Sequence, residues 1–159
     1  MANLIYLTLK GKTQGLISLG CSTANSIGNR FQNGHEDKIQ VISLNHIMTR
    51  EQHVSHHPVA FTKPIDKSSP LLGIAISNNE LLNAEFSMYR TNAFGVIENF
   101  FEVKLTEATI VDVSCAYPNS VENNNLVPFE KVLLRYKSIT WSHKISGTSG
   151  YSIWDDRVY

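Results

Sequence analysis

Apolar and polar residues alternate over several short stretches of this chain, which is the pattern of β-strands with one buried face. The clearest alternation is at residues 82–89, where Leu82, Ala84 and Phe86 are separated by the polar residues Asn83 and Glu85. Similar stretches, bounded by turn residues, occur at residues 4–9, 39–46, 59–65, 96–105, 108–117 and 132–145, the last interrupted near Lys137. This spacing predicts seven to nine strands in a β-barrel or a β-sandwich.

One stretch breaks the β pattern and predicts a short helix. Pro64 ends the preceding strand, because proline cannot donate to a strand ladder. We expect Ser68 and Ser69 to supply N-cap hydroxyls, with Pro70 at the first helical position. An apolar stripe follows, and two asparagines end it. The stripe consists of Leu71, Leu72, Ile74, Ala75 and Ile76, and the predicted helix spans residues 70–78.

Three other segments lack a strand pattern. Residues 14–30 are rich in Gly, Ser, Thr and Asn, and we expect irregular structure there. Residues 47–58 are polar and rich in histidine, and we interpret them as a long loop. Residues 147–159 form a C-terminal tail that carries Tyr151, Ile153, Trp154 and Tyr159. Such a tail frays unless it docks, and docking on its own barrel or on a neighbouring molecule both remain open.

Composition narrows the class of protein further. The 159 residues suit a single domain, 1–159. The 14 basic and 14 acidic residues cancel, so the chain lacks the basic excess that nucleic-acid or membrane-surface binding requires. No apolar run approaches the roughly 18 residues of a membrane span. Charged residues make up only 18% of the chain, which weakens repulsion between copies and favours self-association.

The cysteines and the N-terminus predict where the protein folds. Cys21 and Cys115 lie far apart in the sequence, and we expect two unpaired thiols in a protein folded in the cytoplasm. The first ten residues place no basic leader before their apolar residues, so we expect no signal peptide. Export would then follow a route that does not use a cleaved signal.

The strongest candidate for catalysis is the histidine cluster His53, His56 and His57. Imidazoles three and four residues apart can share a metal on one helical face, but Pro58 disfavours a helix there. We therefore expect loop histidines, and keep a metal-dependent hydrolase as the alternative. The acidic group beginning at His35 precedes a strand and is expected to be a turn. No nucleophile elbow, phosphate loop or dinucleotide motif occurs, so we expect no enzyme, catalytic residue, cofactor or metal.

Three segments together resemble the haemolysin-coregulated protein family, Hcp, of bacterial type VI secretion systems. They are residues 5–11, IYLTLKG; residues 34–43, GHEDKIQVIS, with a His, an acidic pair and an alternating strand; and residues 61–72, FTKPIDKSSPLL. The third carries the family's core motif and is the most specific. The resemblance covers nearly the whole chain, and the histidine-rich loop and the tail are similar to the enterobacterial branch.

This resemblance implies a compact β-barrel of two packed antiparallel sheets with one short helix, similar to phage tail-tube proteins. It also implies a homohexameric ring, rings stacked into the inner tube, and effectors bound and shielded in the lumen. Sheath and spike components would be further partners, and the protein would be secreted through the type VI apparatus. Because the chain ends at Tyr159, we expect a plain tube subunit without a toxin domain.

The resemblance and the residue pattern together give three sets of candidate site residues. The ring-stacking loop comprises Thr49, Arg50, Glu51, Gln52, His53, His56 and His57. Ser43 and Asn45 are the candidates for facing the lumen. The family motif, expected to fix the helix against the barrel wall, comprises Lys63, Asp66, Lys67, Ser68, Ser69 and Pro70. A monomeric ligand-binding barrel with a closed pocket is a third functional interpretation.

Overall fold

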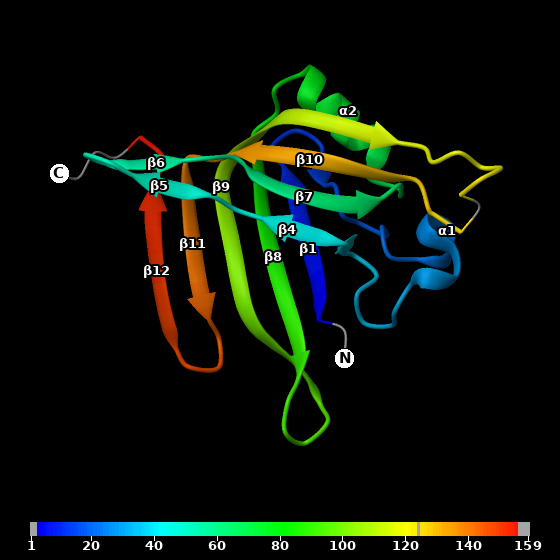
Figure 1. Cartoon of the computed structure of the whole chain (residues 1–159), viewed down its shortest axis with the longest axis horizontal. Coiled ribbons are helices and arrows are strands. Elements are labelled where there is room, and N and C mark those ends of the chain that lie inside the picture. Colours follow the sequence, from blue (N-terminus) through cyan, green and yellow to red (C-terminus); the bar gives the residue numbers. More distant parts are fainter. Residues whose placement is uncertain (1–2, 124, 156–159) are drawn as a thin grey trace.

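The structure is a computed structural model that describes residues 3–123 and 125–155, and these form two packed antiparallel sheets (Figure 1). The larger sheet contains, in order, β2 (Gly15–Leu16), β1 (Leu4–Gly11), β8 (Leu82–Thr91), the first part of β9 (Ile97–Ala116), β11 (Ser138–His143) and β12 (Thr148–Ile153). The smaller sheet contains β4 (Ser43–Asn45), β7 (Val59–Pro64), β10 (Phe129–Arg135) and the second part of β9. The predicted β-rich fold is confirmed.

Two segments join the sheets into a barrel. Strand β9 pairs with β8 in the larger sheet and continues into the smaller sheet, where it pairs with β10. On the other side, β3 (Ile39–Val41) pairs with β1, and the same segment continues as β4, which pairs with β7. The chain thus connects the two sheets on both sides through β9 and through the segment that contains β3 and β4. Apolar residues of both sheets fill the barrel interior, among them Phe61 and Phe86, whose rings meet edge to face at 5.3 Å.

The two strands expected at residues 96–105 and 108–117 form one strand of 20 residues. The bend that separates the two patterns lies at Glu107, which adopts a left-handed backbone with φ of 47°. Glu107 is left out of the pairing with β8, because Ala108 pairs with Leu82 and Leu105 pairs with Ala84. The irregularity lets the strand turn from one sheet into the other without ending.

The single strand expected at residues 39–46 is instead divided between the two sheets. Ile39 and Val41 are buried, whereas Ile42 is 58% exposed at the crossing point. Beyond that crossing, Leu44 is the residue that points inward and packs against the core. Alternation is thus interrupted at Ile42, so Ser43 and Asn45 do not share a face with the buried Ile39 and Val41.

The main helix α2 (Ser69–Ser77) lies one residue earlier than predicted. It buries Leu72 and Ala75, and Ile74 is 45% exposed. Asn78 and Asn79 end it as expected, with Asn79 in the left-handed conformation at φ 49°. The segment expected to be irregular also contains short helical turns, α1 (Ala24–Ile27) and η1 (Gly28–Arg30).

Two segments expected to lack regular structure contain β-strands. The expected loop at 47–58 contains a hairpin of β5 (Met48–Arg50) and β6 (Val54–His56). The expected tail contains β12, which pairs with β11 along its whole length, so the described part docks on its own barrel. Tyr159 lies outside the described residues. The polar, histidine-rich sequence hid the hairpin, and β12 was hidden because only Tyr151 and Ile153 in it alternate with polar residues.

The two cysteines are free, as predicted. Cys21 is buried in the core and Cys115 is exposed near the end of β9.

Candidate assembly surfaces

The family motif forms a buried charged cluster between the barrel and α2. The Lys63 ammonium at the end of β7 contacts Asp66 Oδ1 at 2.9 Å and also the carboxylate of Glu130 on β10. All three side chains are at most 1% exposed. Two carboxylates thus share one cation away from water, an arrangement that holds β7, β10 and the turn before α2 in one geometry.

The two serines of the motif do not cap the helix through their hydroxyls, contrary to the prediction. Ser68 has helical backbone angles and makes no side-chain cap bond, and its hydroxyl donates to Asp66. Ser69 donates to Glu130 at 2.7 Å and accepts from the Asp66 amide at 3.0 Å. Both hydroxyls therefore donate to buried carboxylates and do not cap the helix, because a buried carboxylate left without donors costs free energy.

The other two motif residues lie at the surface. Lys67 is exposed and its amide donates to Ser26, which ties the turn to α1. Pro70 is exposed in the first turn of α2. The buried motif residues thus contact one another and Glu130, which sequence reasoning missed. The signal for Glu130 was present, since it alternates with Val132 and Leu134 on an otherwise apolar face.

The predicted stacking residues divide between the tip and the base of the β5–β6 hairpin. At the tip, Thr49, Arg50, Glu51 and Gln52 are exposed. His53 is half-buried in the turn, and His57 is exposed just after β6. His56 differs from the expected exposed residue, because it is 8% exposed and faces the protein's own barrel.

A network of polar and aromatic side chains fixes the base of this hairpin. The Tyr136 hydroxyl lies 2.7 Å from His46 Nε2 and 2.8 Å from His56 Nδ1. The other ring nitrogen of His56 lies 2.9 Å from Ser152 Oγ on β12. The Trp154 ring stacks on His56 and meets the Tyr136 ring edge to face at 4.9 Å. Sequence reasoning missed this network, since its hydrogen-bonded pairs lie 80 to 96 positions apart.

Burial changes the titration of these groups. It lowers the pKa of His56, because a buried imidazolium loses hydration. Burial also lowers the pKa of His46, and the nearby His56 and His57 add to the effect. Burial raises the pKa of Tyr136 above its ordinary value. All three side chains are therefore held in their neutral forms near neutral pH.

The lumen candidates lie on the outer face of the smaller sheet. Ser43 pairs with Thr62 and Asn45 pairs with Ala60, while Leu44 between them packs inward. Asn45 is exposed and Ser43 is half-buried. A second polar sheet face exists on the outside of the larger sheet. There, Thr8, Glu85, Lys104 and Thr140 follow one another across four strands.

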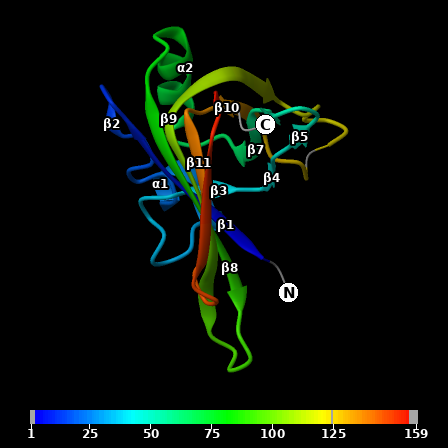
Figure 2. The same cartoon turned by 90° about the vertical axis from the view of Figure 1, so that its left-hand side faces the viewer.

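The molecule also presents unpaired strand edges and an apolar tip. Within the described residues, β12 pairs only with β11 and β4 pairs only with β7. The hairpin between β8 and β9 projects beyond the barrel (Figure 2). Its tip carries Phe94, 91% exposed, followed by Val96 and Ile97 at 59% and 57%. Exposed apolar groups and open edges of this kind are typical of surfaces that contact another chain.

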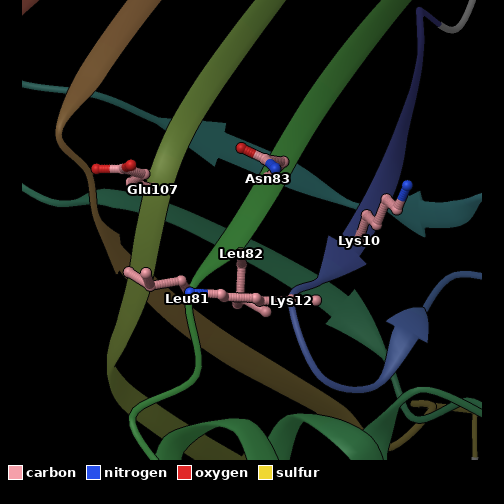
Figure 3. A pocket seen from close by; sticks show the side chains of 7 residues that line it. Lys10, Lys12, Leu81, Leu82, Asn83 and Glu107 are labelled. Atoms are coloured by element: carbon pink, nitrogen blue, oxygen red, sulfur yellow. The ribbon is translucent and has the colours of Figure 1, made fainter.

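A pocket with charged side chains at its rim lies at one end of the barrel. The pocket in Figure 3, of about 320 Å³, lies where β1 and β8 meet the turns at the barrel end. The Lys10 and Glu107 side chains lie at its opposite sides. Among the described residues, no group of three or more His, Cys, Asp or Glu is placed to hold a metal. Both ring nitrogens of His56 are engaged by Tyr136 and Ser152, so the three-histidine metal site considered above is not assembled.

In the described part of the chain, no helix has the length and apolarity needed to cross a membrane.

Comparison with known proteins gives consistent matches over the whole chain. A family described as "Type VI secretion system effector, Hcp" matches residues 6–143. A Pseudomonas aeruginosa protein named "Major exported protein" is 39% identical, and the match covers 99% of each chain. The Escherichia coli protein YhhZ, named as uncharacterised, is 40% identical over 93% of this chain, which spans 37% of that protein.

Solved structures of Hcp proteins have the same fold as this chain. The secreted protein Hcp3 from Pseudomonas aeruginosa is 38% identical, with a TM-score of 0.89, covering 98% of this chain and 100% of that one. A crystal structure of an Hcp protein is 37% identical, with a TM-score of 0.90 and coverage of 98% and 99%. The matching family residues, the full-length relatives and the shared fold show that the chain belongs to the Hcp family of type VI secretion system effectors.

Proposed function

We propose that this chain is a structural subunit of the type VI secretion inner tube. Six copies form a ring, and rings stack into a tube. The protein is made in the cytoplasm, passes into target cells through the apparatus, and contacts the sheath and the spike. The lumen of the ring binds and shields effectors. Family membership and the name of the exported Pseudomonas aeruginosa relative support this proposal.

The observation that carries the proposal is the pair of open strand edges on one barrel. The free edges of β12 and β4 are different surfaces, so pairing one with the other in the next copy is a heterologous contact. Repeated contacts of that kind close into a ring when the rotation between copies permits it. A stable interface buries about 1,600 Å² in total, against 9432 Å² of accessible surface on one subunit. Two flanks of the subunit can therefore each form such an interface.

The polar sheet faces support a conduit. A wall that carries cargo must not adhere to it strongly, and small neutral residues such as Ser43 and Asn45 meet that need. Charges on the other polar face alternate in sign, with Glu85 opposite Lys104. Neither face presents an extended apolar surface.

Export can be tested in the bacterium that makes the protein. We expect the chain in the culture supernatant of cells with a contractile sheath, and its retention in cells from which the sheath is deleted. A cytoplasmic marker protein, absent from both supernatants, controls for lysis. Equal release from both strains would contradict transport through the type VI apparatus.

A further inference from the structure

Both ends of the β5–β6 hairpin are tied to one hydroxyl group. His46 lies two residues before the hairpin, and His56 is its last residue. Their rings approach the Tyr136 hydroxyl at 2.7 and 2.8 Å, from the turn between β10 and β11. His56 continues the chain of bonds to Ser152 on β12. The hairpin thus depends on side chains from two other parts of the fold, the β10–β11 turn and β12.

The hydrogens available in this network limit which hydrogen bonds can form at the same time. The Tyr136 hydroxyl has one hydrogen, so it can donate to only one of the two imidazoles, and the other must donate to its oxygen. If both imidazoles are protonated, both nitrogens become donors toward that one oxygen. The hydroxyl hydrogen then loses its acceptor inside the protein, and two positive charges face each other across it.

We propose that His46, Tyr136 and His56 form a pH-sensitive latch. It holds the β5–β6 hairpin against the barrel and β12 while at least one imidazole is neutral, and it releases the hairpin when both are protonated. The latch is a property of the single subunit, and only its effect on ring stacking rests on the proposed function.

Charged groups around the latch favour its release when both imidazoles are protonated. His57 lies exposed just after β6, beside the latch. The Arg135 guanidinium lies 5.0 Å from the centre of the Trp154 ring, which stacks on His56.

The adjacent pocket beside Tyr136 is also lined by Glu107, Lys137 and Asp155, with Lys137 and Glu107 paired at 3.4 Å. Among the described residues, neither His46 nor His56 forms an ion pair with a carboxylate. In this part of the structure, no paired carboxylate therefore compensates the charge added on either imidazole.

The direction of the pH effect follows from the lowered pKa values of His46 and His56. The released state has more ordinary histidine pKa values, so it binds protons first as the pH falls. The latch is fully closed above about pH 6.5 and weakens below it. Once released, an isolated two-stranded hairpin is only marginally stable in water, so its backbone hydrogen bonds should open.

Amide hydrogen exchange of the purified protein tests the latch directly. We compare residues 47–57 at about pH 7.5 and about pH 5, after correction for the intrinsic exchange rate. Hairpin protection should fall by about tenfold on acidification, whereas protection of β8 in the core should not change. Hairpin protection that stays within about twofold between the two pH values would overturn the proposal.

Substitutions separate the latch from general acid sensitivity. In His46→Gln with His56→Asn, neither side chain can be protonated, and one amide can turn its oxygen to accept from the Tyr136 hydroxyl while the other donates to it. Hairpin protection should then become independent of pH. Tyr136→Phe keeps the ring but removes the hydroxyl, and the hairpin should already exchange fast at neutral pH. The control His143→Gln removes a histidine at the end of β11, outside the network, and should behave as wild type. A double variant that still loses protection on acidification would contradict the latch.

The same samples distinguish the latch from the proposed function. Rings that form but do not unstack at acid pH, with a hairpin that opens, would keep the latch and reject its role in stacking. Absence of rings at any pH would reject the proposed function and leave the exchange result standing.

Discussion

The Lys63 ammonium and the Glu130 carboxylate form an ion pair inside the barrel, with side chains that are 0% and 1% exposed. The pair joins β7 to β10, and Asp66 adds the turn that leads into α2. Burying these charges costs hydration energy, so the cluster is a device that specifies geometry rather than a simple source of stability.

Replacing Lys63 with methionine should therefore destabilise the fold strongly. The substitution leaves the carboxylates of Asp66 and Glu130 buried together without a cation, and removal of one partner of a buried pair typically costs about 3–5 kcal/mol. Urea unfolding followed by tryptophan fluorescence measures the change. The control is Lys137→Met at the exposed pair with Glu107, which should cost about 1 kcal/mol or less. Equal effects of the two substitutions would refute the structural role of the cluster.

Gly11 is required by the approach of a buried carboxylate. A Cβ at this position would lie 1.9 Å from Glu80 Oε2, which accepts the amides of Thr13 and Gln14. Because those bonds hold the carboxylate in place, Gly11→Ala should destabilise the protein by about 1–3 kcal/mol.

Gly73 supplies the matched control for Gly11. It lies in α2 with no atom within 4 Å of an added Cβ, so Gly73→Ala should stabilise the helix by about 0.5–1 kcal/mol. Thermal unfolding of both variants provides the comparison. A Gly11→Ala variant as stable as wild type would show that Glu80 can move aside.

The success of sequence reasoning depended on whether local pattern and tertiary pairing agreed. Residues 82–89 alternate cleanly and form β8 as predicted, because one face meets the core along its length. At Ile42 and Glu107 the chain changes sheets, and no local signal distinguishes such a crossing from a strand end or an uninterrupted strand. Tertiary pairing also gave strand structure to the polar hairpin and tail.

The sequence predicted the contacts of some candidate residues more completely than those of others. The motif around Lys63 lies between the barrel and α2, and its serines were assigned to capping because Glu130 is distant in sequence. The histidines were treated as one loop cluster. The fold separates them, since the partner of His56 is Tyr136, 80 positions away.

Shortening the β5–β6 hairpin should weaken stacking of rings and leave the ring intact. Residues 49–55 can be replaced by Asn-Gly, which favours a tight hairpin turn and keeps His46 and His56 in the chain. Sedimentation and electron microscopy should then show separate rings where wild type forms stacks. Tubes of wild-type length would exclude the hairpin tip, Thr49 to His53, as the stacking surface.

The two polar sheet faces can be assigned by placing the same charge on each. Asn45→Arg alters the smaller sheet, and Thr140→Arg alters the larger one. If Asn45 faces the lumen, its variant should retain less co-expressed effector after purification of the ring, and Thr140→Arg should retain the wild-type amount. The opposite result would place the lumen on the larger sheet.

The central claim is that this barrel forms six-membered rings, and native mass spectrometry combined with negative-stain electron microscopy of the purified chain tests it most directly. The account predicts a species of six times the 17.8 kDa chain mass and ring-shaped particles with a central opening. A 17.8 kDa monomer at micromolar concentration and moderate salt, with no rings on the grid, would contradict it.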